Sequence, residues 1–461
     1  MGYNNYMKKI IILIVTIITT TGLLAACGFF LNPGSASIKD DVYMEYETMM
    51  DAFVEIESIT EVSNYITFWA QTLGMQTQKD RSESVIVETS GISTNGDNTF
   101  ITIECGISLD NLSEDLRAAA IAMVLLKEID EALPLRVLFV PYEGQNYYGA
   151  IKLPSYYLKN TKMIQLNSKY PNDVLTQGAS SKWAYIERPI KLKKPTYKMA
   201  YQITIDGFSN EFPIAEFSNA PNGVKELGSL FATFKSKGIL FEIADFNGGG
   251  PAEFESTTAS AIMVINQNDI KSLQYYYEKI EERLKNNYGS IHPDLLVTMS
   301  AIELPASVLS EEDTDNIISF IYTIFNGFCG TSENVFSSLN QLDITNSNFS
   351  CSLHIRNLIP LEEVEENDDL TVICNLNNMN YELKEMHNGW YQNPDSKYVN
   401  DFLEISNKKP KTTFSKSSLV EYQARDREME KFSYGVDLKD CDRQFFVLKN
   451  YINSIYLAPQ I

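Results

Sequence analysis

Histidine is scarce in this 461-residue chain, which contains three: His292, His354 and His387. Histidine is the commonest metal ligand in proteins and a frequent general base, so three of them leave little material for a metal centre or a catalytic triad. The chain also lacks a Gly-x-Ser-x-Gly turn and a phosphate-binding loop that ends in Gly-Lys-Ser or Gly-Lys-Thr. These absences exclude the usual signatures of serine hydrolases and nucleotide-binding enzymes.

Cysteine and positive charge are also in short supply. The six cysteines are widely spaced and form no Cys-x-x-Cys pair, which argues against a structural zinc site and a disulfide framework. Lys and Arg number 38 against 60 Asp and Glu, and the formal net charge is −22. A chain this acidic is not expected to bind nucleic acid, or to adsorb to an anionic membrane without a lipid of its own.

The N-terminal segment has the pattern of an export signal. Two lysines precede an apolar run over residues 10–24, and Leu-Ala-Ala then precedes Cys27. This resembles a bacterial lipoprotein signal, which implies removal of residues 1–26 and acylation of the Cys27 thiol. We therefore expect residues 27–40 to form a lipidated cysteine and linker that anchor the protein in the lipid bilayer, on the extracytoplasmic side of the cell membrane. The alternatives are an ordinary signal peptide and a single membrane helix, for which the apolar run is short.

The first part of the mature chain alternates helix and strand signals. A helix over 111–133 is expected to begin with a capping box between Asn111 and Glu114 and to end at the following proline. Apolar strands are expected on either side of it, at 99–104 and 135–140. Strand, helix and strand with short connections indicate an α/β architecture with a parallel sheet.

The pattern changes near residue 197. Strands with alternating apolar residues are expected at 199–205 and 256–264, with helices between and after them. We therefore expect an inserted α+β domain with an antiparallel sheet over 197–386. The final stretch, 387–461, returns to helix and strand.

Three segments carry a family resemblance. Residues 243–249 read Ile-Ala-Asp-Phe-Asn-Gly-Gly, residues 351–358 read Cys-Ser-Leu-His-Ile-Arg-Asn-Leu, and residues 389–396 read Gly-Trp-Tyr-Gln-Asn-Pro-Asp-Ser. In the same order, they resemble a turn, a strand and a linker of the bacterial aminoacyl-histidine dipeptidases, the Xaa-His or carnosinase-like dipeptidase family. The helix and strand at 112–140 are similar to elements of that family as well.

The resemblance implies a zinc-exopeptidase-like α/β fold. In that family a catalytic domain with a mainly parallel sheet is interrupted by an inserted α+β lid domain. Here the peptidase-like domain would comprise 41–196 and 387–461, and the lid domain would comprise 197–386. The family binds two zinc ions, which polarise the scissile carbonyl and generate hydroxide, and its substrate lies between the domains.

Most of the family's metal ligands have no counterpart in this chain. The resemblance places the His-x-Asp motif on Gly106 and Ser108, the second Glu of a Glu-Glu pair on Gly144, and a further carboxylate on Asn167. Asp115 matches the bridging aspartate by position, without the flanking glycines, and an acid in a first helical turn is favoured by the helix dipole alone. Glycine offers no ligand, and neutral hydroxyl and amide groups bind zinc weakly.

Glu143 is the one catalytic-type residue that the resemblance retains, because it corresponds to the general base of the family. Without a metal to acidify water it has no useful proton to accept, and the alternative is a solvated loop glutamate. The three histidines lie in the lid segment or at its exit, away from the ligand positions. No cofactor is therefore expected, and zinc only if other residues replace the ligands.

These observations predict a membrane-anchored lipoprotein that resembles a metallo-dipeptidase but is not an active enzyme. Such a pseudoenzyme would act as an interaction module or bind a peptide or amino acid between its domains. One alternative is a divergent active dipeptidase with replaced metal ligands, and a second is a solute-binding lipoprotein. A homodimer through the lid is implied by the resemblance alone.

Overall fold

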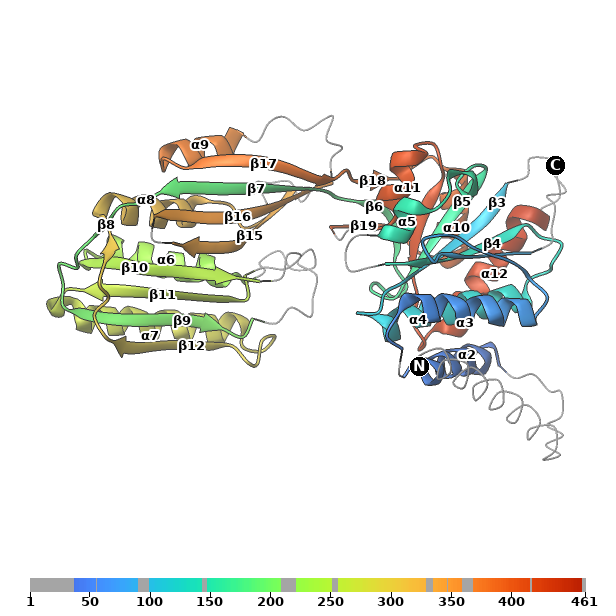
Figure 1. Cartoon of the computed structure of the whole chain (residues 1–461), viewed down its shortest axis with the longest axis horizontal. Helices are drawn as coiled ribbons and strands as arrows, with labels where there is room; N and C mark the ends of the chain where they lie inside the picture. Colours follow the sequence, from blue (N-terminus) through green and yellow to red (C-terminus); the bar gives the residue numbers. More distant parts are fainter. Residues whose placement is uncertain are drawn as a thin grey trace, which may run out of the picture.

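The computed structural model contains two bodies that lie end to end along the long axis of the molecule (Figure 1). The structure describes residues 37–54, 56–89, 99–142, 147–208, 221–250, 256–328, 335–345, 347–358, 368–414 and 417–457. Within these ranges no helix is long and apolar enough to cross a membrane. Cys27, Glu143 and Gly144 lie outside the described residues, so the predictions for them stay predictions.

The first body is built on a nine-stranded sheet with the order β1-β2-β4-β3-β5-β20-β6-β18, and β19 pairs with β6. The strands are β1 Gln76–Lys79, β2 Val85–Glu88, β3 Phe100–Ile107, β4 Leu135–Pro141, β5 Thr161–Asn167, β6 Val174–Gly178, β18 Trp390–Tyr391, β19 Pro410–Thr413 and β20 Lys431–Gly435. Four neighbouring strands, β4, β3, β5 and β20, are parallel, so their carboxyl ends lie at one edge. This confirms the expected mainly parallel sheet.

Helices cover both faces of this sheet. One face packs against α2 Ile38–Ala52, α3 Ile59–Thr72, α4 Leu112–Glu128, α10 Lys397–Ser406 and α12 Cys441–Leu457. The other face packs against α5 Tyr148–Lys152, the short helix η1 Ser155–Tyr157 and α11 Leu419–Arg425. Alternate residues of each strand enter the two cores: Cys105 of β3 points to α4, and its neighbours Glu104 and Gly106 therefore face α5 and α11.

Helix α4 departs from its predicted ends. Asn111 stands at the N-cap but its side chain makes no capping hydrogen bond, so the expected capping box is wrong. The helix stops at Glu128, before the expected end at residue 133, because Ile129 takes an extended backbone. The side chain of Asp130 then accepts a hydrogen bond from the backbone N–H of Ala132 at 2.9 Å, which favours a turn over another turn of helix.

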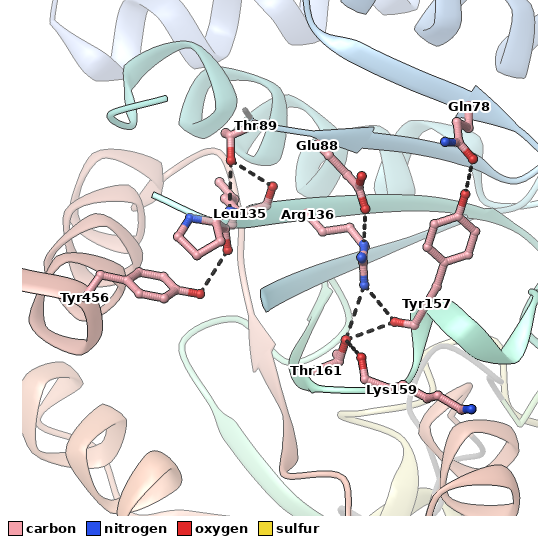
Figure 2. A network of polar contacts seen from close by, with 10 residues as sticks. Gln78, Glu88, Thr89, Leu135, Arg136, Tyr157, Lys159, Thr161 and Tyr456 are labelled. Carbon is pink, nitrogen blue, oxygen red and sulfur yellow. Dashed lines mark hydrogen bonds and ion pairs between the residues drawn. The ribbon is translucent and has the colours of Figure 1, made fainter. Parts of the chain in front are cut away.

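A buried arginine lies in the middle of the first sheet (Figure 2). Arg136 of β4 donates from Nε to Glu88 at 2.6 Å and from a terminal nitrogen to the carbonyl of Tyr157 at 2.8 Å. Its guanidinium lies 4.3 Å from the ring centre of Phe100 and 5.1 Å from that of Tyr157. A charge inside an apolar strand is tolerated here because it is paired and hydrogen-bonded.

The second body has an antiparallel sheet with the order β12-β9-β11-β10-β15-β16-β7-β17, and β14 pairs with β15. Its strands are β7 Ser180–Pro189, β9 Met199–Asp206, β10 Phe241–Gly249, β11 Thr258–Ile265, β12 Leu296–Ile302, β14 Gly327–Phe328, β15 Val335–Ile344, β16 Asn348–Asn357 and β17 Asn380–His387. A small separate pair is formed by β8 Leu192–Lys193 and β13 Val308–Leu309. The sheet begins at Ser180, upstream of the expected start of the inserted domain at residue 197. We call this second body the lid.

The helices of the lid lie on one side of its sheet (Figure 1). They are α6 Gly223–Ser236, α7 Ile270–Tyr288 with the preceding short helix η3 Gln267–Asp269, α8 Glu311–Thr323 and α9 Asp368–Leu376. Their apolar residues form one core with the inward residues of the strands, which include Ala184 and Ile186 of β7. The opposite face of β7 therefore carries Trp183 and Tyr185, away from the helices.

The two bodies are joined through β6 to β7 and through β17 to β18 (Figure 1). A cluster of aromatic rings lies at this junction. The ring of Phe414, which follows β19 of the first body, lies 5.6 Å from that of Phe328 and 6.1 Å from that of Phe336, both in the lid. The lid's position is thus held by apolar packing as well as by the connecting strands.

Candidate functional site

The carboxyl edge of the parallel strands brings the predicted positions together. Gly106 and Ser108 lie at the end of β3, and Asn167 ends the neighbouring parallel strand β5. Asp115 enters from the first turn of α4, where it accepts a hydrogen bond from the backbone N–H of Ser108 at 2.8 Å. We call this group of four residues the sheet-edge site.

Asp115 is the acid of the sheet-edge site. Burial raises the pKa of its carboxyl to about 7; the hydrogen bond from Ser108 opposes the rise, and the charges of Glu114 and Glu104 add to it. Its observed contact is with the backbone after β3, which is a structural role at the start of a helix.

The amide and hydroxyl groups of the sheet-edge site are engaged within the protein. Asn167 donates from Nδ2 to the hydroxyl of Ser433 at 2.6 Å and accepts from the backbone N–H of Tyr170 at 3.1 Å. The hydroxyl of Ser108 accepts from the backbone N–H of Asp110 at 3.2 Å. Both residues thus support the turns that follow their strands.

Tyr142 covers Gly106. A Cβ atom placed on Gly106 would lie 1.9 Å from Cε2 of the Tyr142 ring, far inside van der Waals contact. Tyr142 follows β4, and its backbone N–H donates to the carbonyl of Ile107 at 2.7 Å. Its hydroxyl donates to Oε1 of Glu104. The ring of Tyr147 packs edge-on against it, with ring centres 4.6 Å apart.

Glu104 is the centre of a buried polar cluster that the sequence analysis did not predict. Gln165 of β5 donates to the hydroxyl of Ser418 at 2.5 Å and accepts from the hydroxyl of Ser417 at 2.9 Å. Its amide nitrogen also lies 3.5 Å from the hydroxyl of Tyr142. The group Glu104, Tyr142, Gln165, Ser417 and Ser418, here called the Glu104 cluster, therefore joins β3, β5 and the start of α11.

Among the described residues, no cation pairs with the carboxyl of Glu104. Burial raises its pKa to about 7, against the lowering effect of hydrogen bonds from Tyr142, Gln165 and Ser418. Among the described residues, its Oε2 atom has no hydrogen-bond partner, and neither has the buried hydroxyl of Tyr422 on α11. The one charged residue inside the buried strand at 100–107 was the signal in the sequence that marks this position.

His354 of the lid is locked as a neutral ring. Arg356 donates to its Nδ1 at 3.0 Å, so the proton is on Nε2, which lies 2.6 Å from the hydroxyl of Ser181. The ring also stacks on Trp183 at 4.3 Å. Burial, followed by the charge of Arg356, lowers the pKa of His354 to about 2. With Nε2 as a donor, His354 cannot take a proton from Ser181, so this pair is not an activated nucleophile.

The other two histidines are also in or beside the lid. His292 occurs in the sequence His292-Pro293-Asp294, a His-x-Asp spacing, but it follows α7 and packs against the ring of Phe208 at 5.5 Å. His387 ends β17, and its Nδ1 lies 2.9 Å from the carbonyl oxygen of Asn388. In the described part of the chain, no three His, Cys, Asp or Glu residues are grouped so that they could hold a metal ion.

The sheet-edge site does not fit a zinc centre. Its side chains are one carboxyl, one amide, one hydroxyl and none at Gly106, whereas zinc in proteins takes thiolate, imidazole and carboxylate ligands. The amide and hydroxyl are already bonded within the protein. The arrangement seen here can hold strand ends and a helix start in place; it does not supply a set of metal ligands.

Several solved structures share this architecture, and they include peptidases and an amidase. Aminoacylhistidine dipeptidase from Vibrio alginolyticus matches with a TM-score of 0.68 and 14% identity, over 91% of this chain and 98% of that one. Aminopeptidase PepT from Bacillus cereus and a tripeptidase from Staphylococcus aureus each match with a TM-score of 0.50, at 9% and 8% identity, over 90% of this chain and 98% and 99% of theirs. No protein-family model and no curated protein sequence matches the chain. At these identities the likeness establishes the fold.

Proposed function

We propose that this chain is a lipid-anchored, extracytoplasmic binding module with a dipeptidase-type fold and no peptidase activity. The observation that carries the proposal is the sheet-edge site, where Asp115 is the one acidic side chain and Gly106, Ser108 and Asn167 take the remaining positions. A zinc peptidase needs metal-bound water as its nucleophile, and one carboxyl beside a hydroxyl and an amide that are bonded within the protein is not a sufficient set of zinc ligands.

The fold supports a proposal for the class of ligand. The similar structures act on short peptides by their names, aminoacylhistidine dipeptidase and tripeptidase among them. A site between two bodies can keep its shape after its metal ligands are lost. We therefore propose a peptide or an amino acid as the ligand, and a second copy of the lid as a further partner.

Metal content and hydrolysis test the loss of activity. The mature chain, residues 27–461, is purified in detergent, analysed for metals and assayed against a panel of dipeptides with zinc, with manganese and with a chelator. We expect less than stoichiometric metal and no hydrolysis. Stoichiometric zinc together with chelator-sensitive hydrolysis would instead establish a divergent peptidase, with Glu143 as the first residue to test as its base.

A thermal-shift screen tests binding. A ligand that binds the native state and not the unfolded state raises Tm, by an amount that grows with the ratio of ligand concentration to Kd. We expect at least one dipeptide or amino acid to raise Tm in the absence of zinc. A panel in which no peptide or amino acid shifts Tm would contradict the binding role.

The anchor is tested at Cys27. Cells that express the wild-type chain or Cys27→Ser are given a labelled fatty acid and then fractionated. We expect label and membrane association in the wild type and loss of both in the variant. Cys441→Ser, which changes a buried cysteine of α12, is the matched control. Equal labelling of wild type and Cys27→Ser would contradict acylation at this residue.

A further inference from the structure

We propose that Tyr142 closes the sheet-edge site to metal ions, and that Gly106, Tyr142 and Glu104 form one matched unit in place of a metal centre. This inference rests on the proposed loss of activity and goes beyond it. A site that has merely lost ligands could be repaired by restoring them. A site whose volume has been filled could not.

The first step concerns the space above Gly106. Three atoms of the Tyr142 ring lie 1.9, 2.3 and 2.7 Å from the position that a Cβ on residue 106 would take. Gly106 is not among the residues with positive φ, so its backbone does not require glycine. Glycine is needed at 106 because the ring needs its space.

The second step concerns the freedom of the ring to move away. Tyr142 is held at its backbone by the bond to Ile107, at its hydroxyl by Glu104 and along its edge by Tyr147. Because the ring is held at three points, it cannot move aside in the way that the end of a flexible side chain can. Any side chain at 106, including a histidine able to bind zinc, therefore displaces Tyr142 or is excluded by it.

The third step explains why the ring stays there. The hydroxyl of Tyr142 is a hydrogen-bond donor to a buried carboxyl, and the other oxygen of that carboxyl has no partner among the described residues. Removal of the hydroxyl would take away the hydrogen bond to Oε1, while Gln165 and Ser418 remain bonded to each other. Gly106 makes room for the ring, the ring brings the hydroxyl, and the hydroxyl pairs with one oxygen of Glu104.

A double-mutant cycle tests the match without reference to metal or activity. Gly106→Ala, Tyr142→Ala and the double variant are compared by thermal unfolding of the mature chain. We expect Gly106→Ala to lower Tm by about 3 °C or more in the wild-type background and to have little further effect when Tyr142 is already Ala. Additive effects, or a Gly106→Ala protein with unchanged Tm, would overturn the proposal. The Tm of Gly106→Ala alone can be measured even if Tyr142→Ala does not fold.

Zinc binding then tests the closure itself. The variant Gly106→His/Ser108→Asp/Asn167→Asp restores ligand-type side chains beside Asp115, and it is titrated with zinc alone by calorimetry and dialysis. We expect the addition of Tyr142→Ala to tighten zinc binding by about tenfold or more, and the addition of Tyr148→Ala, which removes a nearby exposed ring of α5 instead, to leave it unchanged. Equally tight zinc binding with Tyr142 present, or no gain on its removal, would overturn closure by this ring. Zinc and hydrolysis in the wild-type protein are separate measurements, so failure of the proposed function can be told from failure of this inference.

Discussion

Two buried carboxyls, Asp313 in the lid and Glu104 in the first body, are held in opposite ways. In the lid, Asp313 at the start of α8 accepts from Arg188 at 2.9 and 3.0 Å, from the hydroxyl of Ser310 at 2.6 Å and from the backbone N–H of Lys191 at 2.9 Å. In the first body, Glu104 has neutral partners and one oxygen without any among the described residues. The lid therefore buries a charge that is fully satisfied, whereas the parallel sheet buries an acid near its neutral form.

The pKa values of the two groups follow this difference. Burial alone would raise the pKa of Asp313, but its hydrogen bonds and the charge of Arg188 outweigh burial and lower it. Burial dominates at Glu104 and raises its pKa to about 7. Asp313 is paired with a cation and therefore stays ionised. Glu104 has no cation partner among the described residues, so it binds a proton more readily.

The largest effect is expected when the lid's pair is broken. Asp313→Asn removes the charge that neutralises the buried guanidinium of Arg188, so we expect a loss of about 3–5 kcal/mol in the free energy of unfolding, measured by urea denaturation. Glu312→Gln is the control, because Glu312 is 68% exposed and lies 3.5 Å from the same arginine; it should cost less than about 1 kcal/mol. Equal losses in the two variants would show that Asp313 carries no special part of the lid's stability.

A smaller effect, with a defined sign, is expected from pH. The folded pKa of Glu104 lies above its unfolded value of 4.5, so its stabilising contribution is complete below that value and is lost as pH rises through about 7. We expect Glu104 to contribute a fall of about 1–3 kcal/mol in the free energy of unfolding between pH 5 and pH 8. Glu104→Gln should reduce the slope of the free energy of unfolding against pH. Part of the slope should remain, because the pKa of Asp115 is also about 7.

The control for this pH dependence is Glu47→Gln, which changes an exposed glutamate on α2. It should leave the slope as in the wild type. Asp313 supplies no slope in this window, because its pKa is lowered and its contribution is lost only as pH falls below its unfolded value of 3.8. His354, whose pKa is lowered to about 2, adds an opposing rise in stability up to its unfolded value of 6.5, so the test is the difference between the wild type and Glu104→Gln. An unchanged slope in Glu104→Gln would contradict the assignment of Glu104 as a near-neutral acid.

The start of α8 should give an effect of about 1 kcal/mol. The hydroxyl of Ser310 accepts a hydrogen bond from the backbone N–H of Asp313 at 3.1 Å, as an N-cap does. Ser310→Ala is expected to lower the free energy of unfolding by about 1–2 kcal/mol, since the bond to the Asp313 carboxylate is lost as well. Ser310→Thr keeps a hydroxyl and should recover most of the loss; a failure to do so would point away from capping.

The start of α4 should give the smallest effect. Asn111 occupies the N-cap without a side-chain hydrogen bond, so Asn111→Ala should change the free energy of unfolding by no more than about 0.5 kcal/mol. The measurement is the same urea titration used for Ser310→Ala. A loss as large as that at Ser310 would mean that the asparagine side chain caps α4 in solution.

Much of the first body could be predicted from residue patterns. A buried parallel strand appears in the sequence as a run of apolar residues, and a helix that packs on it has apolar residues at helical spacing. The turn after α4 could not, since the side chain of Asp130 competes locally with the helix. In the lid, β7 was missed although Ala184 and Ile186 alternate with polar neighbours, because its partners β16 and β17 lie far along the chain.

The sheet-edge site could be predicted in part. The positions of Gly106, Ser108 and Asn167 at strand ends follow from a parallel sheet, and the structure brings them to one edge with Asp115. The contact between the Tyr142 ring and Gly106 could not be predicted, because it depends on the path that the chain takes after β4. Glu104 carried a signal of its own, a charged residue in a buried strand, whose meaning depends on Ser417 and Ser418 more than 300 residues later.

The aromatic cluster at the junction has a mechanical consequence. Phe414 packs with the lid, while Ser417 holds Gln165 in the first body, and three peptide units of chain span at most about 11 Å. The aromatic cluster is therefore tied closely to the first sheet, through the short chain from Phe414 to Ser417 and the hydrogen bond of Ser417 to Gln165. Weakening the hydrogen bonds around Gln165 is expected to loosen this link between the two bodies.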